Sequence, residues 1–200
     1  MRQILKIFLI LPFRKLRSGY FLLFNYLNFK TMNVIYQDLP KIFGRLIISN
    51  YGSCRLGKGL IFRSDITSNL VGLYKPCSIV VAKGGSLNIE DYSGFSGVSI
   101  YCTNNIKIGK YCKFGGNVSI WDTDFHPLNF EDRRCSFIGT KSIPIVIGND
   151  VFVGANSIIL KGVTVGDRVI IGAGSVITKN IPSDEIWAGN PAKFIRKANI

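Results

Sequence analysis

The chain has 200 residues, of which 47% are hydrophobic and 18% are charged. This length suits one domain with an additional arm, and this composition excludes an intrinsically disordered chain. The formal net charge is +13, and residues 1–50 contain eight basic residues against a single acid, Asp38, so over half of the positive surplus lies in the first quarter of the chain.

Residues 1–45 form a predicted N-terminal arm that is basic, rich in aromatic residues and expected to be helical. Its apolar run, residues 7–13, is too short to span a bilayer, and no small-residue cleavage site of a signal peptide follows it. The mixture of Phe, Tyr, Leu, Lys and Arg favours a helix that lies on an anionic membrane surface through residues 1–35. A helix that packs on the domain or on a neighbouring subunit is the alternative. Basic residues mixed with long apolar ones, without a recognised motif, argue against nucleic-acid binding.

Apolar residues recur at every sixth position in the second half of the chain. The series runs through Ile147, Val153, Ile159, Val165, Ile171 and Ile177. The same spacing holds at Ile108, Phe114 and Ile120, more weakly at Ile89 and Phe95, and in a degraded form in LGKGLIF, residues 56–62. A period of six fits neither an amphipathic helix nor an isolated strand.

This period predicts an all-β solenoid over residues 46–187, with coils of three flat sides that each use six residues. Parallel strands of successive coils would stack at about 4.8 Å. Small residues are expected to point inward where the coil is narrow: Val151, Ser157, Val163, Val169 and Ser175. Asn117 and Asn156 share one register, so we interpret Asn117 as a turn residue and not as an oxyanion donor.

The five cysteines are odd in number and show neither a CxxC pair nor a neighbouring histidine. These features argue against a zinc site and against a disulfide framework. We therefore predict a reducing, cytoplasmic location, no metal cofactor, and thiols that act as small apolar fillers, above all Cys102 and Cys112.

The repeat is interrupted between Ile120 and Ile147, a gap that is not a multiple of six. Residues at about 121–143 are therefore predicted to leave the solenoid as a loop, which is a common place for function on a rigid scaffold. The loop contains His126, the single histidine of the chain, together with Asp122, Asp124, Arg133 and Arg134. A surface histidine among turn-forming aspartates is the alternative.

The six-residue repeats resemble those of the hexapeptide-repeat acyltransferases. The tail at residues 169–197 resembles the same family, with the sequence VIIGAGSVITKNIPSDEIWAGNPAKFIRK. The resemblance covers residues 85–197 well and residues 45–85 less well. It implies a left-handed parallel β-helix, since the period alone does not give the hand, with a short C-terminal extension at residues 188–200. It also implies a homotrimer that binds acetyl-CoA, as a co-substrate, in grooves between subunits.

In this family such a loop carries the catalytic histidine, often as HP, and His126–Pro127 matches that motif. The resemblance therefore implies that His126 is a general base, a role that suits imidazole near neutral pH. Asp124 or a backbone carbonyl would fix its tautomer. Asp122 and Asp124 could instead bind the acceptor sugar, and Arg133 and Arg134 could bind the diphosphate of a sugar nucleotide.

The donor site implied by the resemblance lies further along the chain. The pantetheine arm of acetyl-CoA would pass small turn residues, namely Gly154, Ala155, Gly172 and Ala173. The phosphates of acetyl-CoA would meet basic residues near the C-terminal end, namely Lys179, Lys193 and Arg196. Phe152 stands in DVFVG where many relatives carry Trp, so an aromatic wall for the acceptor is kept without its indole.

These predictions favour an acetyl-CoA-dependent O-acetyltransferase that acts on a sugar hydroxyl in surface or exopolysaccharide biosynthesis. The acceptor would be a sugar, a sugar nucleotide or a lipid-linked saccharide, and the protein would work at the inner face of the membrane if its arm binds lipid. An N-acetyltransferase of an amino sugar nucleotide is one alternative, and a non-catalytic scaffold is another.

Overall fold

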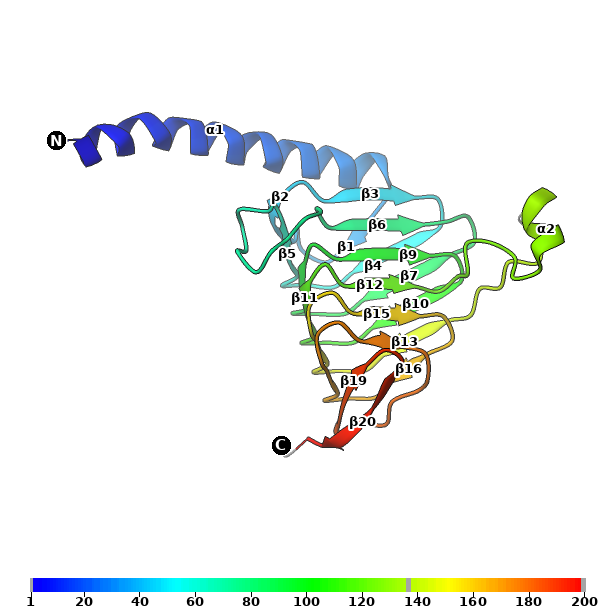
Figure 1. The fold of residues 1–200 in the computed structure, drawn as a ribbon. Coiled ribbons are helices and arrows are strands. Elements are labelled where there is room, and N and C mark those ends of the chain that lie inside the picture. Colours follow the sequence, from blue (N-terminus) through cyan, green and yellow to red (C-terminus); the bar gives the residue numbers. More distant parts are fainter. Residues whose placement is uncertain (1, 136–137, 199–200) are drawn as a thin grey trace.

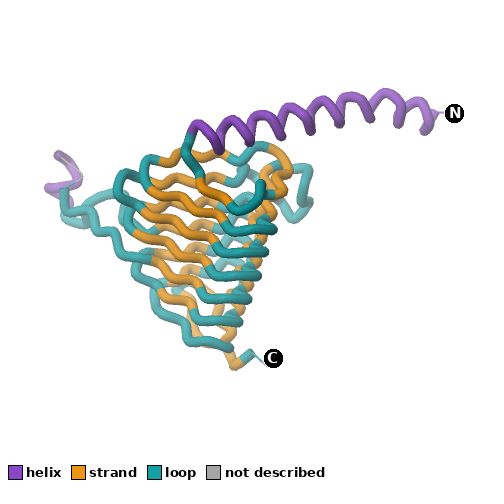
Figure 2. Tube along the Cα trace, turned by 180° about the vertical axis from the view of Figure 1, so that it is seen from behind, coloured by secondary structure: helices purple, strands orange, loops and turns teal. Residues whose placement is uncertain are grey.

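The chain folds into a three-sided coil of stacked parallel strands, with one long helix across its first turn (Figure 1). A computed structural model describes residues 2–135 and 138–198. The parts of the predicted arm, loop and C-terminal extension at residues 1, 136–137 and 199–200 lie outside the described residues. The coil is widest beside the helix and narrows toward the C-terminus (Figure 2).

Each side of the coil is one sheet. Sheet A contains β1 (Ile35–Tyr36), β4 (Ser53–Leu56), β7 (Ser86–Ile89), β10 (Asn105–Ile108), β13 (Ile145–Ile147) and β16 (Thr164–Val165). Sheet B contains β2 (Lys41–Gly44), β5 (Ile61–Ser64), β8 (Gly94–Ser96), β11 (Lys113–Gly116), β14 (Phe152–Val153), β17 (Ile170–Ile171), β19 (Glu185–Gly189) and β20 (Ala192–Lys197). Sheet C contains β3 (Ile47–Asn50), β6 (Ser78–Val81), β9 (Ser99–Cys102), β12 (Ser119–Trp121), β15 (Ile158–Leu160) and β18 (Val176–Ile177).

The period of six corresponds to one side of the coil, as predicted. Residues eighteen apart are Cα partners in neighbouring coils, for example Ile147 with Val165 and Ile159 with Ile177. All six residues of the series are at most 1% exposed. The predicted small inward residues, from Val151 to Ser175, are buried as well. Each coil therefore buries its apolar corners against the coils above and below it.

The degraded early repeats also belong to the coil. Phe62 stacks on Phe95 with ring centroids 4.8 Å apart, and Phe95 stacks on Phe114 at 4.9 Å. These distances equal the spacing of paired strands. The aromatic column shows that residues near 56–62 already form a full coil, in register with the well-formed repeats.

The turns between sheets B and C, which we call the B–C edge, contain both asparagines of the shared register. Asn117 and Asn156 have φ of 63° and 60°, a left-handed conformation that Asn tolerates better than most residues. Asn117 also holds an excursion at residues 65–76, because its Nδ2 donates to Gly72 O at 3.0 Å and its Oδ1 accepts from Tyr74 N at 3.2 Å. Asn117 is thus a turn residue that also anchors a loop.

Four of the five cysteines are buried, as the filler interpretation expects. Burial raises the pKa of Cys54 and Cys102 to about 12 and that of Cys77 and Cys112 to about 11. These four residues remain neutral thiols near neutral pH. Cys135 is exposed.

The long helix α1 (Arg2–Thr31) lies across the wide end of the coil, roughly perpendicular to the direction in which the strands stack (Figures 1 and 2). The coil begins directly after it, since β1 pairs with β4 and β2 pairs with β5. The sequence-based boundary at residue 45 therefore lies inside the first coil. Within residues 2–135 and 138–198, no helix is both long and apolar enough to cross a membrane.

Candidate active site

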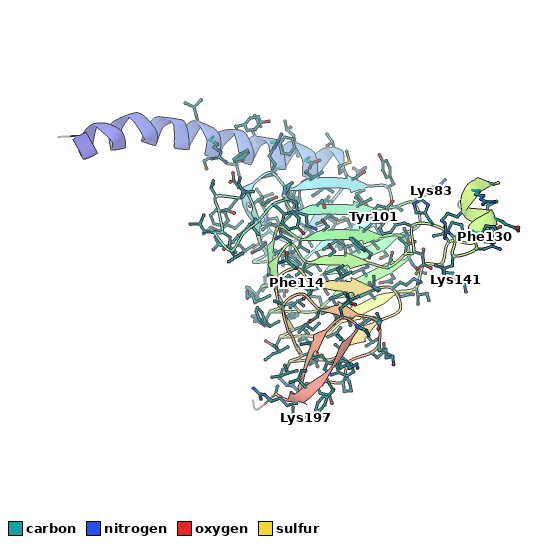
Figure 3. The ribbon with its side chains drawn as sticks, viewed as in Figure 1. Lys83, Tyr101, Phe114, Phe130, Lys141 and Lys197 are labelled. Carbon is teal, nitrogen blue, oxygen red and sulfur yellow. The ribbon has the colours of Figure 1, made fainter. Side chains whose placement is uncertain are left out.

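The chain leaves the coil after β12 and returns at β13, at the edge where sheet C leads to sheet A. We call this the C–A edge. The two ends of the excursion pair with each other: Thr123 and Ser142 form an antiparallel bridge, and Ile143 N donates to Asp122 O at 2.9 Å. We call these paired ends the neck of the loop. The loop beyond the neck contains α2 (Phe130–Cys135), and the labelled Phe130 and Lys141 lie beyond the end of the strands (Figure 3).

Asp122 fixes the base of the loop. It is 0% exposed, and its carboxylate accepts hydrogen bonds from Thr103 N at 2.7 Å, Thr103 Oγ1 at 2.9 Å and Asn104 N at 2.8 Å. Both oxygens are therefore occupied by the preceding turn of the same edge. This environment offers no exposed carboxylate to a sugar, so the expected contact of Asp122 with an acceptor finds no support in its position.

Asp124 forms an ion pair with Lys161, which follows β15 in the next coil. Its other oxygen, Oδ2, is buried and has no hydrogen-bond partner among the described residues. A buried carboxylate oxygen without a partner is costly in a folded protein. Asp124 therefore keeps one acceptor position open two residues before His126.

His126 is exposed, and the residues on either side of it are held by the coil. Phe125 has φ of 65°, which costs a non-glycine residue about 1–2 kcal/mol. Its ring packs edge-on against Tyr101 at 4.8 Å and Trp121 at 5.6 Å. Pro127 is buried. The aromatic contacts stabilise this strained turn and fix the backbone from which the imidazole projects.

The two loop arginines lie on α2. The guanidinium of Arg133 donates to Pro127 O and Leu128 O, both at 3.3 Å. Arg134 lies over the ring of Phe130, with 5.1 Å between its Cζ and the ring centroid. Arg133 thus braces the segment that directly follows His126, whereas Arg134 lies on the exposed outer helix.

The four predicted donor residues come together at the B–C edge. A Cβ on Gly154 would lie 2.4 Å from Ala173 N, and Gly174 N donates to Ala155 O at 2.8 Å. A Cβ on Gly172 would in turn lie 2.8 Å from Ala188 Cβ. Such close stacking requires glycine. It produces a row of small residues along the B–C edge over consecutive coils, which we call the lane: Gly154, Ala155, Gly172 and Ala173.

The predicted basic residues divide between two places. Lys193 and Arg196 are exposed on β20, where they are the Cα partners of Ala188 and Ile186. Lys193 therefore lies beside the lower end of the lane. Lys179 follows β18 at the C–A edge, so one chain does not bring it to the lane.

Phe152 is exposed on the outer face of sheet B, between its Cα partners Lys113 and Ile170. His126 lies at the C–A edge, and sheet C separates that edge from the lane. The five residue steps from Asn156 to Lys161 across sheet C span about 16 Å. Pockets of about 480 and 570 Å³ flank α1, and His126 lines neither of them. One chain thus carries the histidine and the lane on opposite edges of one sheet.

Sequence reasoning missed two features of this region. Lys161 could have been found from the repeat, because Ile120 and Ile159 are equivalent positions in neighbouring coils, which places Lys161 directly below the exit of the loop. The contact of Tyr101 with Phe125 could not, because two extra residues in the intervening coil hide the register. The described residues contain no group of three or more His, Cys, Asp or Glu side chains placed to bind a metal ion.

Comparison with known proteins agrees with this architecture. The family described as "hexapeptide repeat of succinyl-transferase" matches residues 144–179. A protein of Dictyostelium discoideum that carries the provisional name of acetyltransferase is 36% identical over 143 residues, which cover 68% of this chain and 73% of that protein. The chain therefore belongs to the hexapeptide-repeat acetyltransferase family, and its coil is a left-handed parallel β-helix.

Two further relatives are named for sugar acetylation. The galactoside O-acetyltransferase of Escherichia coli K12 is 38% identical over 108 residues, and the chain spans only about half of its length, 51%. The crystal structure of the polysialic acid O-acetyltransferase OatWY matches with a TM-score of 0.59 and 27% identity, over 83% of this chain and 74% of that one.

Proposed function

We propose that this chain transfers an acetyl group from acetyl-CoA to a hydroxyl group of a sugar, with His126 as the general base. The observation that carries the proposal is an exposed histidine on a loop whose base is held by buried hydrogen bonds. Membership of the acetyltransferase family supports the acetyl donor. The names of the galactoside and polysialic acid O-acetyltransferases support a sugar hydroxyl as the acceptor.

The proposed reaction is a direct transfer. A nitrogen of His126 accepts the proton of the acceptor hydroxyl while the hydroxyl oxygen attacks the thioester carbonyl. The carbon–sulfur bond of acetyl-CoA then breaks, the sulfur leaves as the coenzyme A thiolate, and the imidazolium supplies the proton that makes it a thiol. Imidazole can accept a proton near neutral pH, which suits a histidine to the role of general base.

Asp124 and Lys161 are proposed to position this histidine. Lys161 neutralises Asp124 from the next coil, and the buried Oδ2 of Asp124 remains available as an acceptor. A hydrogen bond from the ring or from an acceptor hydroxyl to Oδ2 would satisfy that atom. Asp124 is therefore the first residue to test for orientation of the base or of the sugar.

The lane at the B–C edge fits the donor. Gly154, Ala155, Gly172 and Ala173 present backbone and small side chains over two coils, which suits the amide-containing pantetheine arm. Lys193 and Arg196 supply positive charge for phosphates at the lower end. Orientation of a bound donor against the acceptor can contribute about 7–11 kcal/mol to lowering a bimolecular barrier.

A second copy of the chain would join the two halves of the site. The histidine and the lane lie on opposite edges of sheet C, about 16 Å apart along the strand direction. We propose a cyclic trimer in which the C–A edge of one subunit faces the B–C edge of the next. We therefore propose three sites per trimer, each with the histidine of one subunit and the lane of its neighbour.

The acceptor is proposed to lie on the aromatic cluster of Tyr101, Trp121 and Phe125. All three side chains are half-buried and border the histidine segment. The three rings provide an apolar face for a pyranose, while the Tyr101 hydroxyl and the Trp121 indole N–H can hydrogen-bond to sugar hydroxyls. We propose a sugar of a surface or exopolysaccharide as this acceptor.

The test is release of coenzyme A thiol from acetyl-CoA with a panel of neutral sugars, oligosaccharides and amino sugar nucleotides. We expect turnover with a hydroxyl acceptor and a fall in kcat of about 10²–10⁴-fold for His126→Asn. The control is Tyr51→Ala, an exposed residue at the same edge in an earlier coil, which should keep normal rates.

Three results would contradict the proposal. Normal turnover by His126→Asn with an intact oligomer would remove His126 from the reaction. Turnover only with amino sugar nucleotides would make the chain an N-acetyltransferase. Absence of turnover with every acceptor, together with no binding of acetyl-CoA, would favour a scaffold.

A further inference from the structure

The outer face of α1 carries a stripe of large apolar side chains. Leu16, Tyr20, Leu23 and Leu27 follow one another at helical spacing and are between 50% and 75% exposed. Residues at this spacing lie on one face of a helix. The opposite face contains Asn25 and Phe29, which are buried against the coil. The apolar stripe therefore points away from the rest of the chain.

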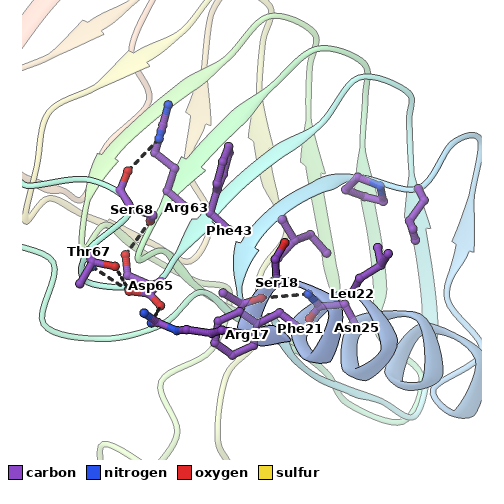
Figure 4. Close-up of a pocket in the computed structure, with 14 residues that line it drawn as sticks. Arg17, Ser18, Phe21, Leu22, Asn25, Phe43, Arg63, Asp65, Thr67 and Ser68 are labelled. Carbon is purple, nitrogen blue, oxygen red and sulfur yellow. Dashed lines mark hydrogen bonds and ion pairs between the residues drawn. The ribbon is translucent and has the colours of Figure 1, made fainter. Parts of the chain in front are cut away.

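This orientation of α1 is fixed by specific contacts. Asn25 Nδ2 donates to Gly44 O at 2.9 Å, and Asn25 Oδ1 accepts from Leu46 N at 3.0 Å. Figure 4 shows Arg17 of the helix paired with Asp65 of the neighbouring excursion. The helix cannot turn its stripe inward without breaking these bonds, so the exposed apolar surface is a stable feature of the described chain.

The charge of α1 indicates what could cover this stripe. The helix contains six basic residues and no acidic one: Arg2, Lys6, Arg14, Lys15, Arg17 and Lys30. A helix with exposed Leu and Tyr and a basic sequence matches the interface of an anionic bilayer, where apolar side chains enter the acyl boundary and positive charge is attracted to the headgroups. A neutral protein surface would leave this charge uncompensated.

We propose that α1 is a docking surface for an anionic lipid bilayer. The helix lies across the wide end of the coil, roughly perpendicular to the direction in which the strands stack (Figures 1 and 2), so a helix lying in the membrane plane makes the coil stand upright on the membrane. The stripe then faces lipid, and the loop with His126 leaves the coil three strand spacings below β3, at about 14 Å further from the bilayer.

The test uses co-sedimentation of the full-length chain with vesicles of phosphatidylcholine alone or mixed equally with phosphatidylglycerol. We expect binding to the anionic vesicles at least tenfold tighter than to the neutral ones, and weaker binding in high salt because exposed charges are screened. Leu23→Asp with Leu27→Asp should reduce anionic binding at least tenfold.

The matched control is Phe194→Asp with Ile195→Asp, at the opposite end of the coil. These two side chains are 48% and 57% exposed, so the pair changes charge and apolar area as the helix pair does, and it should leave vesicle binding unchanged. Equal loss in both pairs, or equal binding to neutral and anionic vesicles, overturns the proposal. Loss of binding together with dissociation of the oligomer also overturns it, because the stripe would then serve a second copy of the chain.

Labels at the two ends of the coil test the upright orientation. Cys135 is the exposed cysteine, so both labels are placed in a Cys135→Ser background. Energy transfer to acceptor lipids should be weaker from a label placed by Phe194→Cys, on β20 at the opposite end of the coil from α1, than from a label placed by Leu23→Cys. Transfer of equal efficiency from both positions would overturn the orientation. None of these measurements uses acetyl-CoA, so their failure is distinguishable from failure of the proposed catalytic function.

Discussion

Two different roles can be assigned to Asp122, and the two roles predict different results for the same substitution. Its place in the loop predicted a contact with the acceptor sugar, whereas its burial and its hydrogen bonds assign it to the loop base. The perturbation is Asp122→Ala, which removes the carboxylate and leaves Thr103 N and Asn104 N without their acceptor.

The expected loss follows from those bonds. Hydrogen bonds to a charged group contribute about 1.5–3 kcal/mol each. Water can replace part of this loss, because Asn104 is exposed and Thr103 is half-buried. We therefore expect a destabilisation of about 3 kcal/mol, which corresponds to roughly 6–12 °C in Tm for a chain of this size. Asp122→Asn keeps one acceptor oxygen and should recover part of this loss.

The assay is thermal unfolding at a fixed protein concentration, paired with steady-state kinetics of Asp122→Asn. Fixed concentration is necessary because subunit association stabilises the folded state. Asp132→Ala, an exposed carboxylate on α2, is the control and should change stability by no more than about 0.5 kcal/mol. A raised KM for the sugar with an unchanged Tm in Asp122→Asn would refute the structural interpretation.

Four further outcomes are expected. Trp121→Ala should raise KM for the sugar more than KM for acetyl-CoA in steady-state kinetics, because the ring borders the proposed acceptor site. Gly154→Ala should lower Tm, since its Cβ would meet the backbone of the next coil at 2.4 Å. A thiol reagent at pH 8 should label Cys135 rapidly and the four buried cysteines only after unfolding. Lys197 and Trp187 donate hydrogen bonds that lower the pKa of Glu185. The stabilisation of the fold by these bonds is present above the ordinary pKa of about 4.5 and is lost as the pH falls through the lowered value. Lys197→Met should therefore lower Tm at pH 6 and change it less at pH 3.

The solenoid could be predicted because its signal is repeated many times. The six apolar positions from Ile147 to Ile177 occupy equivalent places on successive sides of the coil, so one irregular residue does not hide the period. The early coils were harder to recognise, because the excursion at residues 65–76 separates β5 from β6 and shifts the count. The column of Phe62, Phe95 and Phe114 restores the register in space, where the sequence spacing does not.

The boundary of the arm was placed too far along the chain for a related reason. Tyr36, Ile42 and Ile48 keep the sixfold spacing, but Leu56 comes eight positions after Ile48, so one isolated coil does not stand out in the sequence. The pairing of β1 with β4 and of β2 with β5 shows that this coil belongs to the solenoid. Composition could indicate a basic, aromatic helix, but only the contacts of Asn25 and Phe29 decide which face meets the coil. The exposed apolar stripe is a consequence of that choice.

The candidate site was partly accessible from sequence. The interruption of the repeat located the loop, and its position agrees with the excursion between Trp121 and Ile145. The roles of its two aspartates were not accessible, because Asp122 and Asp124 are chemically alike and differ only in what surrounds them. Asp122 is enclosed by the preceding turn, whereas Asp124 meets Lys161 of the following coil.

Because of the way in which the loop is inserted, the stability of the fold and the specificity for the acceptor depend on different residues. Ile106 pairs with Ile145 across the insertion, in the register that an uninterrupted coil would have, and β12 pairs with β15 as if no residues intervened. The neck closes through Thr123 and Ser142, so the stack does not depend on what the loop contains beyond them. The stack therefore depends little on the chemistry of the described loop residues beyond this neck, although Asp124 and Phe125 contact the coil themselves. Because His126 and the arginines of α2 belong to this segment, acceptor specificity can change there while the lane of small residues, which is part of the stack itself, remains constrained by packing.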